Sequence, residues 1–165
     1  MAIDISAVGS RVEIHAGGSV IQITQFSDEG TPFECADVDL SDNKKNLNGQ
    51  MISSRTPSVY PVSVTVVAGS TEDKALAEIA QKSAIMPGSV QPISSIIVDK
   101  IVLSIPSINM SGEGAVASMN YVWLVGRMKN APTGPSTSAE GRLTPRTYTF
   151  EMEQYRPPTG SATSI

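Results

Sequence analysis

The sequence predicts a mainly β protein with one α-helix, folded as an antiparallel β-sandwich or barrel. Apolar and polar residues alternate with a period of two in several segments, as they do in strands that bury one face. Charged residues make up only 17% of the chain, and 22 Ser and 12 Thr supply much of its polar character, which suits exposed sheet faces. Convincing helical spacing of apolar residues occurs in one segment.

The length of 165 residues fits one domain, which we assign to residues 1–155. A long polar arm at about 41–58 and a mobile loop at about 130–142 are expected to project from it, because both are polar and rich in turn-forming residues. Residues 156–165 are predicted to form a flexible C-terminal tail.

Seven segments predict strands, in chain order 11–16, 19–26, 33–40, 60–67, 95–105, 115–125 and 146–155. The first two are separated by Gly17-Gly18, which favours a tight hairpin turn. The fourth alternates most regularly, since Val62, Val64 and Val66 share one face. The fifth is apolar on both faces, which indicates a buried central strand.

The predicted helix and the tip of the arm rest on local signals. Residues 71–84 carry apolar residues at helical spacing, with Ser70 or Thr71 as the N-cap. Within the arm, Asn48-Gly49 predicts that the tip is a small hairpin turn.

The short sequences that match motifs for cofactor or metal binding lack the surrounding residues or elements that those motifs require. Residues 112–117 match G-x-G-x-x-A, but a strand follows rather than a helix, so we interpret them as a flexible turn. Asp37, Asp39 and Asp42 lack the Gly and Glu spacing of an EF-hand loop, which indicates a solvated strand end.

The chain has one cysteine, Cys35, and one histidine, His15, too few for an intramolecular disulfide or a structural zinc site. No nucleophile motif and no candidate pair of catalytic carboxylates stands out. We therefore expect no enzymatic activity, no cofactor and no bound metal.

The charge balance also limits which classes of partner the chain can bind. The net charge is −4, and Lys44-Lys45 is the only basic pair, which argues against a DNA-binding module but allows DNA to pass without binding. No signal peptide is expected, and no apolar run approaches the ~20 residues of a membrane span.

The order of these features resembles the tail tube proteins of contractile-tailed phages, and the related tube proteins of tailocins and type VI secretion systems. Residues 51–83 carry most of the likeness, where the strand from Tyr60 to Val66 leads into the capped helix that begins at Ser70-Thr71. The likeness is one of architecture and extends over nearly the whole chain.

The resemblance implies a hexameric ring in which sheets of neighbouring copies form one continuous inner β-barrel. Stacked rings would form the inner tail tube, the conduit for DNA into the host. The implied partners are further copies of the chain, the tail sheath, a baseplate or initiator protein, the tail terminator and the tape measure protein. The implied location is the virion tail, assembled in the bacterial cytoplasm.

Two sets of residues follow as candidates for this assembly. The arm would reach a neighbouring subunit or ring through Asn43, Lys44, Lys45, Asn46, Leu47, Asn48, Gly49, Met51, Ile52 and Arg55. The lumen would be lined by outward polar residues of two strands, Ser63, Thr65, Thr147, Thr149, Glu151 and Glu153.

Two alternatives stay open from the sequence. The first is the tube protein of a type VI-like or extracellular contractile injection system. The second is a carbohydrate-binding or decorating β-sandwich of the virion, although the chain holds only eight aromatic residues for binding sugars.

Overall fold

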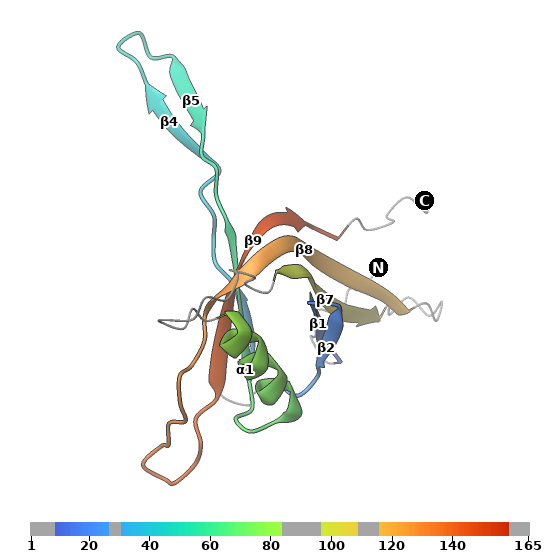
Figure 1. Cartoon of the computed structure of the whole chain (residues 1–165). Helices are drawn as coiled ribbons and strands as arrows, with labels where there is room; N and C mark the ends of the chain where they lie inside the picture. Colours follow the sequence, from blue (N-terminus) through green and yellow to red (C-terminus); the bar gives the residue numbers. More distant parts are fainter. Residues whose placement is uncertain (1–8, 27–30, 84–96, 109–115, 159–165) are drawn as a thin grey trace.

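The computed structural model describes residues 9–26, 31–83, 97–108 and 116–158 of the chain. These residues form a β-rich body with one helix, from which a two-stranded hairpin projects (Figure 1). The elements are β1 (Arg11–Ala16), β2 (Ser19–Ile23), β3 (Phe33–Cys35), β4 (Ser41–Lys45), β5 (Met51–Arg55), β6 (Tyr60–Val66), α1 (Thr71–Ser83), β7 (Val98–Ile108), β8 (Val116–Asn130) and β9 (Arg146–Arg156).

The seven predicted strands build one seven-stranded sheet in the order β2-β1-β7-β8-β9-β6-β3. Every neighbouring pair is antiparallel. The prediction of a mainly β, antiparallel fold with one helix is therefore confirmed. Of the two predicted architectures, a sandwich or a barrel, the structure excludes a sandwich of two sheets packed face to face, because the strands form a single curved sheet. The arm contributes a separate two-stranded sheet, β4-β5.

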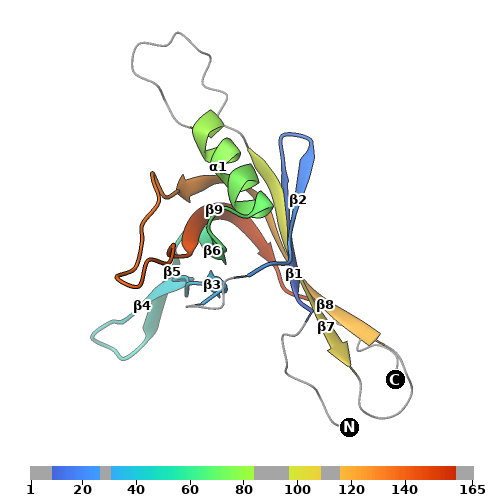
Figure 2. The ribbon, with the colours of Figure 1, turned by 90° about the horizontal axis from the view of Figure 1, so that it is seen from below.

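The sheet curves around its own core. Figures 1 and 2 show β8 and β9 bending sharply, so that the β1-β2 end and the β6-β9 end of the sheet approach each other. Buried side chains from β1, β2, β6, β7, β8, β9 and α1 belong to one hydrophobic cluster. After β2, Phe26 forms an isolated bridge with Val66 of β6, which links the two ends of the curve.

The period-two alternation places the core face of each strand. Val62, Val64 and Val66 of β6 are fully buried, as are the residues of β9 that pair with them or lie beside them, Tyr148, Phe150 and Met152. The helix α1 adds Leu76 and Ile79 to the same cluster. Burial of each such side chain stabilises the fold by about 1.5–3 kcal/mol.

Strand β8 is longer than predicted, because it continues through a change of backbone direction at the residue where the predicted strand ends. Val125 has a φ of 52°, and the strand continues past it to Asn130. Trp123, before Val125, and Met128, after it, both pack on the core although they are an odd number of residues apart. A strict period of two cannot place both on one face, so the alternation expected from the sequence ends at Val125.

Other boundaries also shift. Strand β3 ends at Cys35 instead of residue 40, and β2 ends at Ile23 instead of residue 26. The prediction that β7 is an interior strand is confirmed by its position between β1 and β8, although Val102 on its outer face is half-buried only. The predicted turn at 112–117 and the tail at 156–165 lie partly outside the described residues. No helix among the described residues is long and apolar enough to span a membrane.

Candidate functional site

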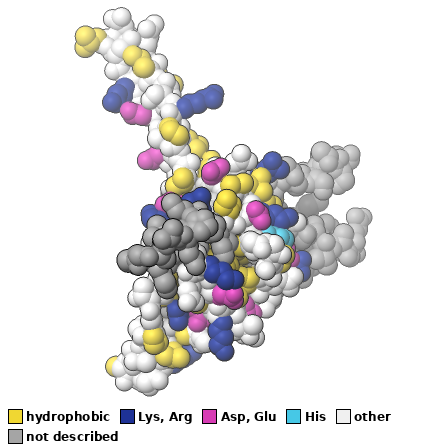
Figure 3. Space-filling model, viewed as in Figure 1, with side chains coloured by type: hydrophobic (Ala, Val, Ile, Leu, Met, Phe, Trp, Pro, Cys, Tyr) yellow, Lys and Arg dark blue, Asp and Glu magenta, His cyan; other side chains and the backbone are white. Residues whose placement is uncertain are grey.

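The projecting hairpin β4–β5, with the segments that carry it, is the most exposed part of the described chain. Strands β4 and β5 pair in antiparallel register from Ser41 opposite Arg55 to Lys45 opposite Met51. Every residue of both strands is exposed. The predicted arm at about 41–58 thus corresponds in position to a hairpin that stands away from the body (Figures 1 and 3).

The tip of the hairpin is shaped by Asn46 and Gly49. The Asn46 side-chain oxygen accepts hydrogen bonds from the backbone N–H groups of Asn48 and Gln50, at 3.0 and 2.9 Å. Gly49 has a φ of 78°, a left-handed conformation that a residue with a Cβ adopts at a cost of about 1–2 kcal/mol. The tip turn predicted from Asn48-Gly49 is therefore confirmed.

The root of the hairpin is fastened across its two chain segments. The Thr56 N–H donates to the Leu40 carbonyl oxygen at 3.2 Å, and the Ser58 hydroxyl donates to the Asp39 carbonyl oxygen at 2.7 Å. These bonds extend the pairing of β4 and β5 toward the body. The arm therefore leaves the sheet as a continuous two-stranded projection.

The arm exposes large apolar side chains beside basic ones. Leu47 at the tip is fully exposed, and Met51 and Ile52 are 68% and 60% exposed. Figure 3 shows apolar and basic side chains on this projection. Exposed aliphatic side chains at this density on a projection suit a surface that another molecule covers.

The candidate lumen residues lie on the outer face of β6 and β9. Ser63 is opposite Thr149 and Thr65 is opposite Thr147, and the paired hydroxyl groups are 3.2 and 2.9 Å apart. The hydroxyl pairs stabilise the contact between the two strands. Thr65 is only 8% exposed, so its role in the body is mainly this pairing.

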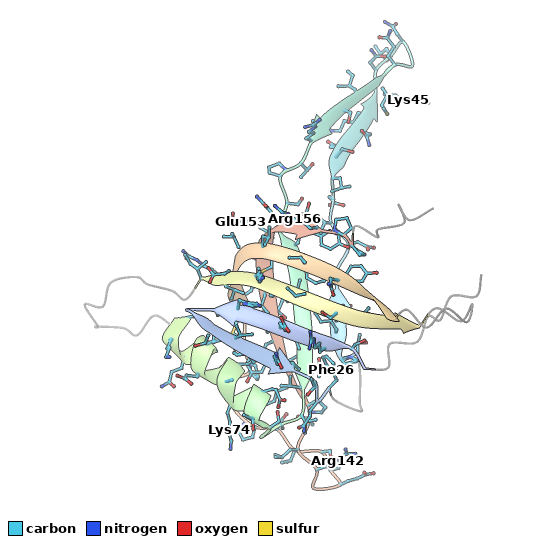
Figure 4. The ribbon with its side chains drawn as sticks, turned by 90° about the vertical axis from the view of Figure 1, so that its right-hand side faces the viewer. Phe26, Lys45, Lys74, Arg142, Glu153 and Arg156 are labelled. Atoms are coloured by element: carbon cyan, nitrogen blue, oxygen red, sulfur yellow. The ribbon has the colours of Figure 1, made fainter. Side chains whose placement is uncertain are left out.

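The acidic members of that set continue along β9. Glu151 is opposite Pro61 and forms an ion pair with Lys129 of β8 at 3.0 Å. Glu153 is exposed and lies near the root of the arm, close to Arg156 in Figure 4. The outer face of β9 is therefore polar from Thr147 to Glu153. It is separate from the arm hairpin itself, where Lys45 lies at the far end (Figure 4).

A second, smaller projection lies at the end of the body opposite the arm (Figure 1). In the loop at about 130–142, Thr137 bridges Leu143, and the Ser138 N–H donates to the Arg142 carbonyl oxygen at 2.7 Å. Leu143 is 50% exposed. The sequence predicts a mobile loop here and does not predict this hydrogen-bonded turn, in which Gly141 has a φ of 77°.

A buried polar cluster anchors the start of α1. The Asp73 carboxylate accepts hydrogen bonds from the Tyr148 hydroxyl at 2.6 Å and from the Gly69 N–H at 2.9 Å, and Arg146 Nε lies 3.2 Å from it. Burial, and then the hydrogen bond to Asp73, raise the pKa of Tyr148 far above its ordinary value. The cluster is structural, because Asp73 and Tyr148 are almost entirely removed from solvent.

The described residues offer little for catalysis. Cys35 is exposed, yet partial desolvation of its thiol, and then the charge of Glu34, raise its pKa to about 11, which keeps the thiol protonated at neutral pH. His15 lies 3.6 Å from Glu13 and is directly opposite Lys100 of β7. No group of three His, Cys, Asp or Glu residues within the described part of the chain is placed to hold a metal ion.

An aromatic group lies where β3, β6, β8 and β9 meet at the root of the arm. Trp123 has its ring centroid 5.5 Å from that of Phe33 and 5.3 Å from that of Tyr155, and Tyr60 lies 6.0 Å from Tyr155. Such pairs contribute about 0.5–1.5 kcal/mol each beyond burial. The group packs β3, β6, β8 and β9 together beside the root of the arm.

Comparisons with known proteins agree with a role in a phage tail. The sequence pattern of the family described as "Tail fiber protein gp32" matches residues 3–156. Among solved structures, the chain is similar to the sheath/tube terminator of an extracellular contractile injection system, PVC, in its extended state. The two share 13% sequence identity over 94% of this chain and 98% of that chain, with a TM-score of 0.54.

A second solved structure, the anti-feeding prophage cap described as the AFP tube terminating cap, is similar at 14% identity over 94% of this chain and 93% of that one, with a TM-score of 0.49. No curated protein sequence matches the chain. The family match extends over nearly the whole chain, and the family is one of structural tail proteins without enzymatic activity, as expected from the sequence. The chain therefore belongs to the tail fiber protein gp32 family of phage tail proteins.

Proposed function

We propose that the chain is a structural tail protein that joins copies of itself into a ring at the end of the tail tube, in the manner of a terminator. The observation that carries this proposal is the similarity over 94% of the chain to a sheath/tube terminator. The neighbouring components would be the tube and the sheath, which that protein's description names. This position differs from the stacked tube that the sequence resemblance implies.

The fold supplies what a ring requires. The sheet is open at β2 and β3, and strand edges left open in one copy are commonly covered by another chain. A head-to-tail contact between copies closes into a ring when the rotation permits. In such a ring the arm would reach an adjacent copy, and its exposed Leu47, Met51 and Ile52 would be buried there.

The lumen face stays part of this proposal. In a ring, the outer face of β6 and β9, with Ser63, Thr149 and Glu151, would line the channel. Carboxylate groups repel phosphate, and hydroxyl groups carry no positive charge that would displace its counterions, so DNA would pass without tight binding. A hexamer is the symmetry that the resemblance to tube proteins implies.

Electron microscopy and mass photometry of the purified full chain test the proposal. Closed rings whose mass stays constant as the protein concentration rises support a terminator. Filaments that lengthen with concentration would show that the chain is the tube protein itself, and needle-shaped oligomers would favour a fibre, as the family description suggests. Monomers that bind glycans would support the decorating sandwich and overturn self-assembly.

Deletion of residues 43–55 tests the arm. Because every residue of β4 and β5 is exposed, the deleted chain should fold with an unchanged melting temperature. It should sediment as a monomer under conditions in which the full chain forms rings. Rings of normal mass after the deletion would refute the role of the arm.

A further inference from the structure

We propose that the arm is inserted between other copies of this chain, which contact both of its broad faces. This inference rests on the proposed function, in that the arm is taken to mediate self-assembly. It adds the manner of contact and the partner. A hairpin that merely lies on a neighbouring surface would use one face and leave the other in water.

The register of the hairpin places equivalent side chains on opposite faces. Lys45 is directly opposite Met51, and the next pair along the ladder is Lys44 opposite Ile52. Partners opposite each other in an antiparallel ladder point to the same face, and successive pairs point to opposite faces. Each face of the arm therefore carries one lysine beside one large aliphatic side chain.

This distribution differs from that of a strand with one docked face. A hairpin with one buried face has apolar residues on that face and polar residues on the other. Here Met51 on one face is 68% exposed and Ile52 on the other is 60% exposed, so neither face is the apolar one. Covering only one face would leave the other aliphatic side chain in water.

The tip and the marginal stability of the arm point the same way. Leu47, at the tip, is fully exposed and would be the leading side chain of an inserted hairpin. A two-stranded hairpin without a third strand or a packed face is marginally stable in water. Contacts on both faces would supply the missing packing.

Charge complementarity identifies the partner as a copy of this chain. The whole chain has 12 Lys and Arg residues and 16 Asp and Glu residues. Residues 40–58 hold three of the basic residues and one of the acidic ones, so the net charge is +2 for the arm and −6 for the rest of the chain. Neither Lys45 nor Arg55 forms an ion pair among the described residues, while Lys44 lies 3.5 Å from Asp42. The arm therefore carries unpaired positive charge that an acidic surface would complement. The body of another copy of the chain is such a surface.

Single substitutions on opposite faces separate the two manners of contact. Met51→Ser and Ile52→Ser each remove one aliphatic side chain and leave the charge and the tip turn unchanged. If both faces are covered, each variant should weaken ring formation at least about tenfold, the effect of losing one buried aliphatic side chain. Sedimentation velocity across a concentration series measures this, and circular dichroism checks that the body is folded.

Ser53→Ala and Ser54→Ala are the matched controls, because Ser53 shares the face of Met51 and Ser54 shares that of Ile52. Both controls should assemble within about twofold of the parent chain, as expected for exposed positions that lose a small polar group. If only one of the two aliphatic substitutions weakens assembly, the arm lies on a surface and the inference is wrong, although the assembly role stands. If neither does while deletion of residues 43–55 abolishes rings, the inference is equally overturned. If that deletion also has no effect, the proposed role of the arm fails as well.

Discussion

Asp73 is the residue on which the junction between α1 and the sheet depends. Asp73 is only 3% exposed. Its carboxylate contacts three groups from separate parts of the chain: the Gly69 N–H, the Tyr148 hydroxyl and the Arg146 guanidinium. Its own N–H donates to the Ser70 hydroxyl oxygen at 3.2 Å, which caps the helix. A buried carboxylate is tolerated here because each of its neighbours donates a hydrogen bond or a positive charge.

Asp73→Ala should destabilise the fold by about 2–4 kcal/mol, because it leaves buried donors and the Arg146 charge without their acceptor. Urea unfolding followed by circular dichroism measures the change. Glu78→Ala is the matched control on the same helix. It breaks an exposed ion pair with Lys82 at 2.8 Å and should leave the unfolding midpoint unchanged within error. Equal unfolding midpoints for the two variants would show that the cluster does not stabilise the fold.

Gly126 is required by the close approach of β8 and β9 next to the bend. A Cβ at this position would lie 2.5 Å from the Met152 sulfur and 2.8 Å from its Cα, and would also overlap the Glu151 carbonyl oxygen. Backbone atoms of a paired strand cannot move away locally. Gly126→Ala should therefore lower the free energy of unfolding by about 1–3 kcal/mol.

Gly134→Ala provides the control for this substitution, since a Cβ there would meet nothing within 4 Å. It should change stability by no more than about 0.5 kcal/mol. Thermal unfolding of both variants against the parent chain tests the comparison. A Gly126→Ala variant as stable as the Gly134→Ala variant would mean that β8 and β9 separate more easily than their contacts indicate.

At the scale of elements, the arm and the sheet should differ in local stability. The amides of β4 and β5 are held by a two-stranded ladder without a buried face, whereas those of β6 and β9 lie in the interior of the sheet above the core. Hydrogen exchange of the unassembled chain should therefore be fast at 41–55 and slow in β6 and β9. In the assembled ring the arm amides should become protected. Arm exchange as slow as that of β6 in the monomer, or equally fast after assembly, would contradict this.

The elements themselves were largely predictable from local patterns. The alternation of apolar and polar residues located the seven strands of the sheet. The capping residues and the helical spacing predicted a helix over 71–84, and α1 extends from Thr71 to Ser83. The length of β8 was not predictable, because the positive φ that shifts the alternation belongs to Val125, a residue type that rarely adopts it, and not to the neighbouring Gly126. The choice between a sandwich and a barrel stayed open from the sequence, since the order of strands and the curvature of the single sheet arise from contacts distant in sequence, such as the bridge between Phe26 and Val66.

The candidate assembly residues were predictable in part. The arm followed from its polarity and from Asn48-Gly49, and the hydroxyl residues of β6 and β9 followed from alternation. That Ser63 and Thr65 lie directly opposite Thr149 and Thr147 depends on the pairing of strands far apart in sequence, which no local pattern contains. The equivalence of the two arm faces likewise became visible only with the register of Lys44 and Lys45.

At the scale of the whole molecule, charge is divided between the arm and the body. The +2 of residues 40–58 and the −6 of the remainder attract each other between copies, whereas the bodies repel one another. Both interactions are screened by salt, with a Debye length of about 10 Å at 0.1 M and about 3 Å at 1 M. The arm contact, at close range, combines this attraction with apolar burial at Met51 and Ile52, which salt does not screen.

Raising NaCl from 0.05 to 0.5 M should therefore weaken ring formation by the parent chain. The affinity of Lys45→Gln for ring formation should depend less steeply on the salt concentration, because this variant lacks one of the attracting charges. Gln is shorter than Lys by about one atom and keeps the first two methylene groups, so the substitution removes the charge and retains part of the apolar contact beside Met51. Sedimentation velocity at four salt concentrations gives the slopes. Stronger assembly at high salt would show that repulsion between the acidic bodies outweighs the arm contact, and identical slopes for the two chains would show that Lys45 meets no acidic partner. Because the exposed Lys129–Glu151 pair within one body is equally screened in both chains, the difference between slopes isolates the contact between copies.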